Sequence, residues 1–135
     1  MAQRTDEHQL VKLGDSDFRL QAPEYDIRGL DAYDDEGNEI GSVEDLYVDE
    51  QERKVRFMDV GAGGFLGMGE KHFMIPVEAL REVNEDRVMV DQSREKVAGS
   101  PPFDHDVVPR PSYQREVYDY YGYADPHRGP YPGGA

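Results

Sequence analysis

Residues 59–76 have the sequence DVGAGGFLGMGEKHFMIP, in which a glycine-rich stretch separates two short apolar runs. Five glycines from Gly61 to Gly69 permit backbone conformations that other residues avoid, and they disfavour a helix. The flanking runs contain valine, phenylalanine and isoleucine, which are common in strands. We therefore predict the end of one strand, a wide hairpin loop and a second strand.

The loop carries three apolar side chains, those of Phe65, Leu66 and Met68. On a flexible turn they must either fold back onto a core or contact a partner, and exposed apolar clusters usually mark contact sites. A phosphate-binding loop would instead require Gly-x-x-x-x-Gly-Lys-Ser/Thr leading into a helix. Because this motif is missing and residues 72–75 have a strand-like pattern, we interpret the stretch as a hairpin loop. Its three apolar residues are therefore protein-interaction candidates.

The chain has 135 residues, a net charge of −14 and no cysteine. This length indicates one domain with tails, and the lack of cysteine excludes disulfides, cysteine metal sites and a thiol nucleophile. Neither a signal-peptide pattern nor the roughly 20 consecutive apolar residues of a membrane span is present. We expect a soluble, cytoplasmic protein with no membrane insertion.

The negative charge is concentrated in residues 31–52, which contain ten carboxylates and no lysine or arginine. Such a surface repels the phosphates of nucleic acids and anionic lipids, whose recognition requires clustered cations. A direct nucleic-acid partner is therefore disfavoured. The simpler alternative, that the charge only keeps the protein soluble, stays open.

Short strands separated by Asp, Asn and Gly turns predict an all-β protein that forms a small, strongly bent barrel. Ile40 and Val43 would fall on opposite faces of a regular strand, which predicts a bulge near residues 41–45. Pro76 ends the preceding strand, and residues 77–83 are expected to form one or two helical turns. Ser93 is expected to cap a short helix that extends to Val97. The predicted strands lie within residues 26–33 and at residues 39–49, 54–60, 71–75 and 87–91.

The composition divides the chain into an N-terminal arm (1–23), the barrel domain (24–98) and a tail (99–135). The tail holds seven of the nine prolines and six of the nine tyrosines. Residues 112–121 are predicted to form a short helix capped by Ser112, whereas residues 126–135 are expected to be disordered.

The helix would dock on its own barrel, on a second copy or on a partner. Docking on its own barrel is preferred, because tyrosines bury their rings while keeping a polar tip, and the other two alternatives stay open. Its interaction candidates are Tyr118, Tyr120 and Tyr121; the residues predicted to share one face are Tyr113, Val117, Tyr120 and Tyr121.

An ordered series of motifs resembles the PRC-barrel family over about residues 13–97. The motifs are D-x-R-G (26–29), DDEG (34–37), IG-x-V-x-DL-x-VD (40–49), GFLGMGEKH (64–72) and IP-x-EAL (75–80). The segment YDYYGY (118–123) is similar to the ending of free-standing bacterial members. The family takes its name from the cytoplasmic domain of the photosynthetic reaction centre H subunit, and a related barrel ends a ribosome-maturation factor.

This resemblance implies a small bent barrel used for docking or assembly, with no catalytic motif. It therefore implies a non-catalytic module that docks a protein partner or a second copy of itself, for example as a homodimer. Two alternatives are a cytoplasmic-side regulator of a membrane electron-transfer complex and a ribosome-maturation factor that binds a basic ribosomal protein. The chain lacks the transmembrane helix of the first relative and the RNA-associated domain of the second.

The carboxylate pairs do not match the patterns of acid–base catalysis or calcium binding. The carboxylate pairs Asp34/Asp35 and Glu44/Asp45 are expected to be solvated turn residues instead of an acid–base pair, and the turn at 34–38 lacks the alternating oxygens of a calcium loop. We expect no enzymatic activity, no cofactor, no metal and no small-molecule substrate.

The four histidines, His8, His72, His105 and His127, match no zinc-binding pattern. His72 is interpreted as a strand-end residue that hydrogen-bonds the glycine loop. The alternative, a pH-sensing role, rests on the near-neutral pKa of histidine.

Overall fold

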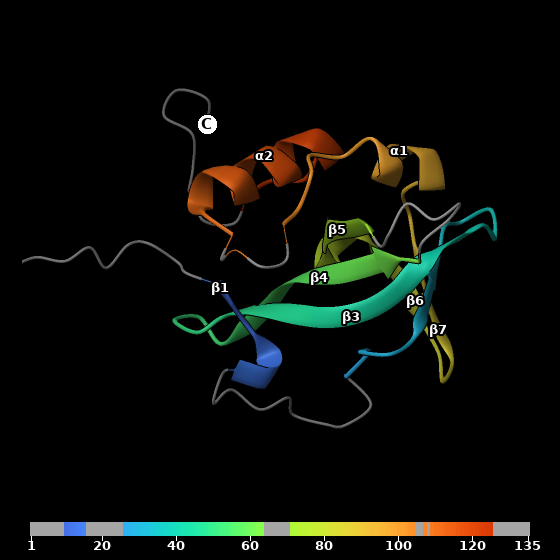
Figure 1. Cartoon of the computed structure of the whole chain (residues 1–135), viewed down its shortest axis with the longest axis horizontal. Coiled ribbons are helices and arrows are strands. Elements are labelled where there is room, and N and C mark those ends of the chain that lie inside the picture. The colour runs from blue at the N-terminus through green and yellow to red at the C-terminus, as the bar shows by residue number, and fades with distance from the viewer. Residues whose placement is uncertain (1–9, 16–25, 64–70, 105–106, 108, 126–135) are drawn as a thin grey trace, which may run out of the picture.

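The structure is a computed structural model that describes residues 10–15, 26–63, 71–104, 107 and 109–125. Within these residues, seven strands form one bent sheet, and two α-helices lie together over one side of it (Figure 1). The predicted all-β class with a strongly bent, barrel-like sheet is confirmed. Phe65, Leu66 and Met68 lie outside the described residues.

The sheet has the strand order β5-β4-β3-β2-β7-β6, with β1 paired to the far end of β3, and it does not close. All described pairs are antiparallel except β2 with β7. The strands are β1 (Leu10–Lys12), β2 (Asp31–Tyr33), β3 (Glu39–Asp49), β4 (Lys54–Ala62), β5 (Lys71–Pro76), β6 (Leu80–Val83) and β7 (Arg87–Val90). The helices are the 3₁₀ turns η1 (Leu13–Asp15) and η4 (Val77–Ala79) and the α-helices α1 (Arg94–Ala98) and α2 (Pro111–Tyr121).

Two register shifts bend the long β3–β4 pair. One lies between Val43 and Asp45, which confirms the predicted bulge, and the other lies between Tyr47 and Val48. An extra residue on one strand increases the local twist. The strands also approach closely at Gly41, where a Cβ atom would overlap the backbone carbonyl of Gly61. Glycine at this position therefore allows the bent pair to close up.

The helices depend on local signals at their ends. Ser93 caps α1 by accepting a hydrogen bond from the backbone N–H of Lys96 at 3.0 Å, as predicted. The predicted Ser112 cap is wrong: α2 begins with Pro111 at its first turn, where a missing N–H costs no hydrogen bond. It ends at Gly122, whose φ of 84° is left-handed.

The segment 77–83 differs from the prediction of helical turns. Only η4 is helical, and Leu80 to Val83 form β6, which pairs with β7. Pairing with a neighbouring strand overrides a weak local preference in so short a segment. A second finding lies in the predicted N-terminal arm, where Leu10 is fully buried and β1 joins the sheet.

Candidate functional site

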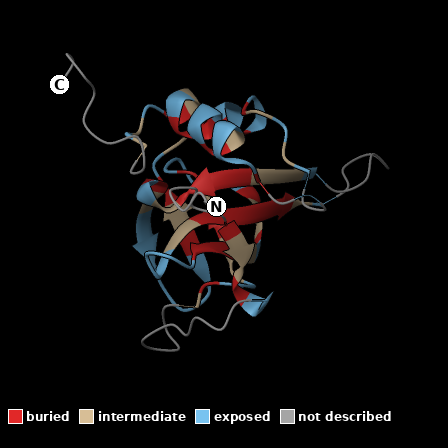
Figure 2. Ribbon diagram, turned by 90° about the vertical axis from the view of Figure 1, so that its left-hand side faces the viewer, coloured by how far each residue is buried: buried red, intermediate tan, exposed pale blue. Residues whose placement is uncertain are grey.

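The outer face of the β3–β4 pair is covered by α2. The ring of Tyr118, which is 1% exposed, lies 5.0 Å from the ring of Phe57 on β4. The ring of Phe103 lies between Tyr47 on β3, at 5.7 Å, and Tyr113 on α2, at 6.0 Å. Figure 2 shows that the strands beneath the helices are largely buried, whereas the opposite side of the helices is exposed. An aromatic layer therefore joins helix and sheet.

Tyrosine hydroxyl groups form hydrogen bonds at the edges of this layer. Tyr120 donates to the backbone carbonyl of Lys96 in α1 at 2.7 Å, and Tyr123 donates to the Asp91 carboxylate at 2.7 Å. Burial is the main reason why the pKa values of Tyr121 and Tyr123 are raised to about 12. Of the predicted tyrosine candidates, Tyr118 and Tyr121 are thus buried against their own chain and Tyr120 is half-buried. The described part of the tail packs on its own sheet.

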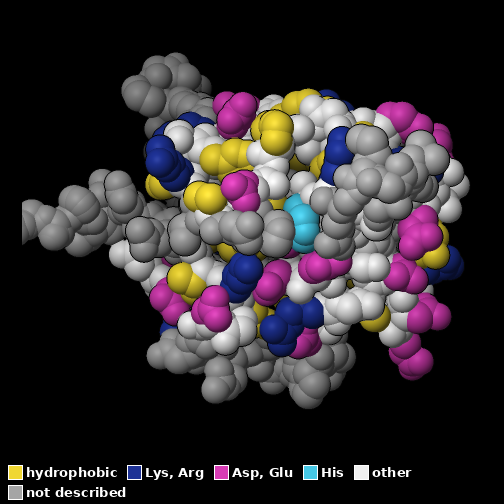
Figure 3. Space-filling view, viewed as in Figure 1, with side chains coloured by type: hydrophobic (Ala, Val, Ile, Leu, Met, Phe, Trp, Pro, Cys, Tyr) yellow, Lys and Arg dark blue, Asp and Glu magenta, His cyan; other side chains and the backbone are white. Residues whose placement is uncertain are grey.

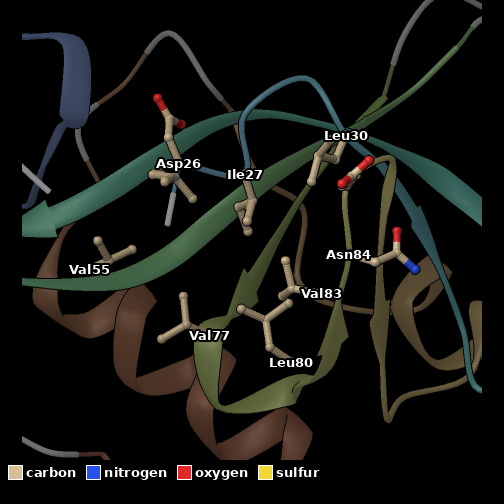
Figure 4. Close-up of a pocket in the computed structure, with 10 residues that line it drawn as sticks. Asp26, Ile27, Leu30, Val55, Val77, Leu80, Val83 and Asn84 are labelled. Carbon is tan, nitrogen blue, oxygen red and sulfur yellow. The ribbon is translucent and has the colours of Figure 1, made fainter. Parts of the chain in front are cut away.

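The opposite, inner face of the sheet is not covered by α1 or α2 (Figure 1). There a cavity of about 860 Å³ lies between β3 and β4 on one side and η4 and β6 on the other (Figure 4). Figure 4 shows the apolar side chains that line the cavity pointing toward one another, with Asn84 near the edge. The described lining residues are mainly apolar: Asp26, Ile27, Leu30, Leu46, Val55, Val77, Leu80, Val83, Asn84 and Glu85. We call this cavity the inner groove.

The register shift at Tyr47/Val48 explains why the two faces differ. On β3, Tyr47 contacts Phe103 on the helix side, whereas Leu46 lines the inner groove. On β4, Phe57 contacts α2, and Val55 lines the inner groove with Leu46. Residues 55 and 57 would share one face in a regular strand. The bulge places them on opposite faces.

Residues 26–30 form a third wall of the inner groove, and backbone hydrogen bonds anchor this wall to β3. The N–H of Gly29 donates to the carbonyl of Val43 at 2.7 Å, and the N–H of Val43 donates to the carbonyl of Leu30 at 2.8 Å. Gly29 has a φ of 92°, which few other residues adopt. This turn directs Ile27 and Leu30 into the groove, so the wall is set by the fold.

Among the described residues that line the inner groove, the charged ones are the two carboxylates Asp26 and Glu85. The Arg28 guanidinium contacts Asp26 at 2.7 Å, and this side-chain hydrogen bond is the main reason that the pKa of Asp26 is lowered. A second cation, the guanidinium of Arg87, lies 5.3 Å from the centre of the Tyr33 ring. Over a wider area, Figure 3 shows carboxylates spread across one face of the molecule, with basic side chains between them.

The predicted solvated pair at Asp34 and Asp35 is corrected by the structure at Asp34, which is 0% exposed. Its carboxylate accepts hydrogen bonds from the backbone N–H groups of Glu36, Asn38 and Arg94, the last at 2.9 Å. Burial alone would raise the pKa of Asp34, but these hydrogen bonds lower it overall. Asp34 therefore joins the β2–β3 turn to the start of α1 and serves the fold.

The predicted pH-sensitive candidate His72 lies on β5, where its Nδ1 atom is 2.8 Å from a carboxylate oxygen of Asp59 on β4. Both side chains are nearly buried, with exposed fractions of 7% and 4%. The residue pattern alone does not indicate Asp59 as the partner of His72, although the predicted antiparallel hairpin brings the two strands together. The pH-sensing role stays a prediction. The glycine loop and the other three histidines lie outside the described residues.

Other site classes find little support in the described part of the chain. It holds no cluster of three or more His, Asp or Glu side chains suited to a metal ion. None of the helices in the described ranges is long and apolar enough to cross a membrane.

The inner groove itself was not predicted. Its described residues come from four separate segments, and a sequence signal for it is the apolar Val83 directly before a turn. Val83 is 46% exposed, which among the described large apolar residues is matched only by Val107 at 52%.

Comparison with known proteins locates the groove within a family domain. The family model for the PRC-barrel domain matches residues 24–97, more than half of the chain. No curated protein matches the sequence. All the described residues that line the inner groove fall inside the matched region, whereas α2 falls outside it. The groove is therefore a feature of the matched domain, and the covering helix is an addition to it.

Proposed function

The chain belongs to the PRC-barrel family, and we propose that it is a non-catalytic protein-docking module whose partner binds in the inner groove. The family domain is a small β-barrel module often involved in protein interactions. The single observation that carries the proposal is an open, mainly apolar cavity of about 860 Å³ on the inner face of the sheet.

The contrast with the outer face supports docking at the groove. On the outer face, Phe57 of the sheet packs against Tyr118 of α2, so this part of the sheet is already covered within the chain. In the inner groove, aliphatic side chains form a contiguous lining, and Val83 stays 46% exposed. Contiguous exposed apolar surface on a folded protein usually marks a contact site. A partner that buries this lining gains the free energy of removing it from water.

A matched pair of variants tests the proposal. Val83→Asp places a charge at the groove, and Val107→Asp makes the same change at the other large apolar residue that is exposed among those described, at 52%. Val107 lies outside the residues that line the groove. We expect the wild type and Val107→Asp to capture the same proteins from an extract of the source cells, and Val83→Asp to lose them.

Thermal unfolding and circular dichroism of the three proteins provide the control for folding. Both substitutions are at exposed positions, where changes in unfolding free energy usually stay within about 0.5 kcal/mol. If Val83→Asp is folded and still captures the same proteins as Val107→Asp, the groove is not the docking site and the proposal fails.

A second copy of the chain is one partner that this function includes. Light scattering coupled to gel filtration gives the solution mass of the full chain and of the Val83→Asp variant. A dimer that Val83→Asp converts to a monomer would assign the groove to self-assembly. A monomer in both cases assigns it to a different protein.

Two narrower roles follow from the family resemblance and stay predictions. A regulator of a membrane electron-transfer complex should co-fractionate with that complex. A ribosome-maturation role requires a basic ribosomal protein to contact the acidic residues 31–52, and increasing salt should weaken such a contact. A wholly soluble pool that does not bind ribosomal proteins would contradict both roles and leave the docking module itself intact.

A further inference from the structure

We propose that the inner groove binds a peptide segment in which apolar side chains are flanked by lysine or arginine. This inference rests on the proposed docking function and specifies the chemistry of the partner. The argument has two parts, the apolar lining of the groove and the sign of the charge at its edge.

The lining selects an apolar segment. Leu46 and Val55 come from the long hairpin, and Val77 and Leu80 come from the opposite wall, so apolar side chains face one another across the cavity (Figure 4). Among the described lining residues, the polar ones are Asp26, Asn84 and Glu85. Burying a polar group without a hydrogen-bond partner is costly, so the centre of the cavity favours aliphatic or aromatic side chains.

The charge at the groove selects cations beside that segment. Among the described residues, the charged ones that line the groove are the carboxylates Asp26 and Glu85, and Asp26 is already paired with Arg28. Glu85 lies in the turn between β6 and β7 and is exposed, so it can meet a charge on the partner. Arg81 lies on β6 between two lining residues but does not line the cavity itself. The net charge of −14 attracts a cationic segment over a longer range.

The same features disfavour other ligands. An anionic lipid or nucleic acid requires clustered basic side chains, whereas the described groove residues include none. An acidic peptide would place like charges next to Glu85, which lowers affinity. Charge complementarity therefore favours a basic, apolar peptide over these alternatives.

Two labelled peptides with the same apolar centre test this proposal, one flanked by lysines and the other by glutamates. Fluorescence polarisation with the full chain measures their affinities. We expect the lysine-flanked peptide to bind at least about tenfold more tightly, the ratio that corresponds to a modest difference in binding free energy. Added salt should reduce this ratio, because exposed charges are screened.

A charge reversal locates the preference. Glu85→Lys changes the charge at the groove, and Glu36→Lys makes the same change in the turn next to Asp34, outside the groove lining. Both residues are exposed, so both variants should fold. We expect Glu85→Lys to remove most of the preference for lysine flanks and Glu36→Lys to retain it.

The outcomes separate this inference from the docking function. If both peptides bind equally, or if Glu36→Lys and Glu85→Lys behave alike, the proposed partner chemistry is wrong and the docking site stands. If neither peptide binds while Val83→Asp still abolishes capture, the groove holds another occupant and the inference is overturned. A dimer that Val83→Asp disrupts would identify that occupant as a second copy. If Val83→Asp also captures normally, the docking function itself fails.

Discussion

The two faces of the bent sheet differ in what covers them. On the outer face, the ring of Phe57 on β4 contacts Tyr118 of α2. Tyrosine hydroxyls in α2 and just after it donate hydrogen bonds to the backbone of α1 and to Asp91, the residue that follows β7. On the inner face, aliphatic side chains line an open groove with carboxylates beside it. Tyrosine suits the covered face because its ring packs while its hydroxyl finds an acceptor at the edge.

This difference separates stability from recognition. Apolar surface that the chain covers itself contributes to the free energy of folding, whereas apolar surface that stays open contributes only when a partner covers it. Substitutions on the outer face should therefore change unfolding, and substitutions at the edge of the groove should change binding. The following predictions test that division.

The largest effect is expected for Phe57→Ala. Phe57 is fully buried and contacts Tyr118, so its removal leaves a cavity between sheet and helix. We expect the free energy of unfolding to fall by about 3–5 kcal/mol in urea denaturation. Val83→Ala serves as the control at the groove and should change it by less than about 0.5 kcal/mol. Equal losses in the two variants would contradict the division between the faces.

Alkaline pH should destabilise the packing of α2 on the outer face of the sheet. Burial raises the pKa of Tyr121 and Tyr123 from 10 to about 12, so these tyrosines ionise more readily in the unfolded chain. Their contribution to stability is complete below pH 10 and is lost as the pH rises from 10 to about 12. A spectrophotometric phenolate titration, followed together with circular dichroism, checks this. Ionisation of all tyrosines near pH 10 without loss of helix would contradict the raised pKa values of Tyr121 and Tyr123.

Asp34→Ala should lower stability at neutral pH by about 2 kcal/mol, because the backbone N–H groups of the turn and of Arg94 lose their acceptor. The pKa of Asp34 is lowered in the folded state. Its contribution is therefore present above the ordinary pKa of 3.8 and is lost as the pH falls below that value.

Urea denaturation at neutral and acid pH measures the difference between Asp34→Ala and the wild type. Asp35→Ala, at the exposed neighbouring position, is the matched control and should be close to neutral. A difference that persists unchanged in acid would show that the ionised carboxylate is not the cause.

The smallest effect is expected for Tyr118→Phe, and it has the opposite sign. The Tyr118 hydroxyl is buried with no hydrogen-bond partner among the described residues, and burial raises its pKa. Removing an unsatisfied polar atom should increase the free energy of unfolding by about 1 kcal/mol. A loss of stability in thermal or urea unfolding would reveal that this hydroxyl has a partner.

Much of the fold follows from local patterns in the sequence. Strands were predicted where apolar residues alternate, and turns were predicted where Asp, Asn and Gly gather. Gly37, in the turn at 34–38, has a φ of 88°, and Ser93 caps α1. Where local preference and tertiary pairing compete, the prediction fails. Residues 80–83 have no strong preference of their own and become a strand by pairing with β7.

The two faces were harder to predict because they depend on contacts between distant segments. The predicted apolar face of the tail helix included Tyr113 and Tyr120, whereas the buried residues are Gln114, Val117, Tyr118 and Tyr121. Tyr113 and Tyr120 lie at the edges of the contact and donate to backbone carbonyls. The inner groove depends on a single bulge that sends Val55 and Phe57 to opposite faces, and no local pattern indicates this position.

The most direct test of the groove assignment is methyl-detected NMR of the full chain during titration with the lysine-flanked peptide. Val55, Val77, Leu80 and Val83 report on the groove, and Val117 in α2 reports on the covered face. We predict that the groove methyl signals shift in a saturable manner while the Val117 signals do not. Shifts confined to Val117, or no saturable shift at the groove, would contradict the binding of a lysine-flanked apolar peptide in the inner groove.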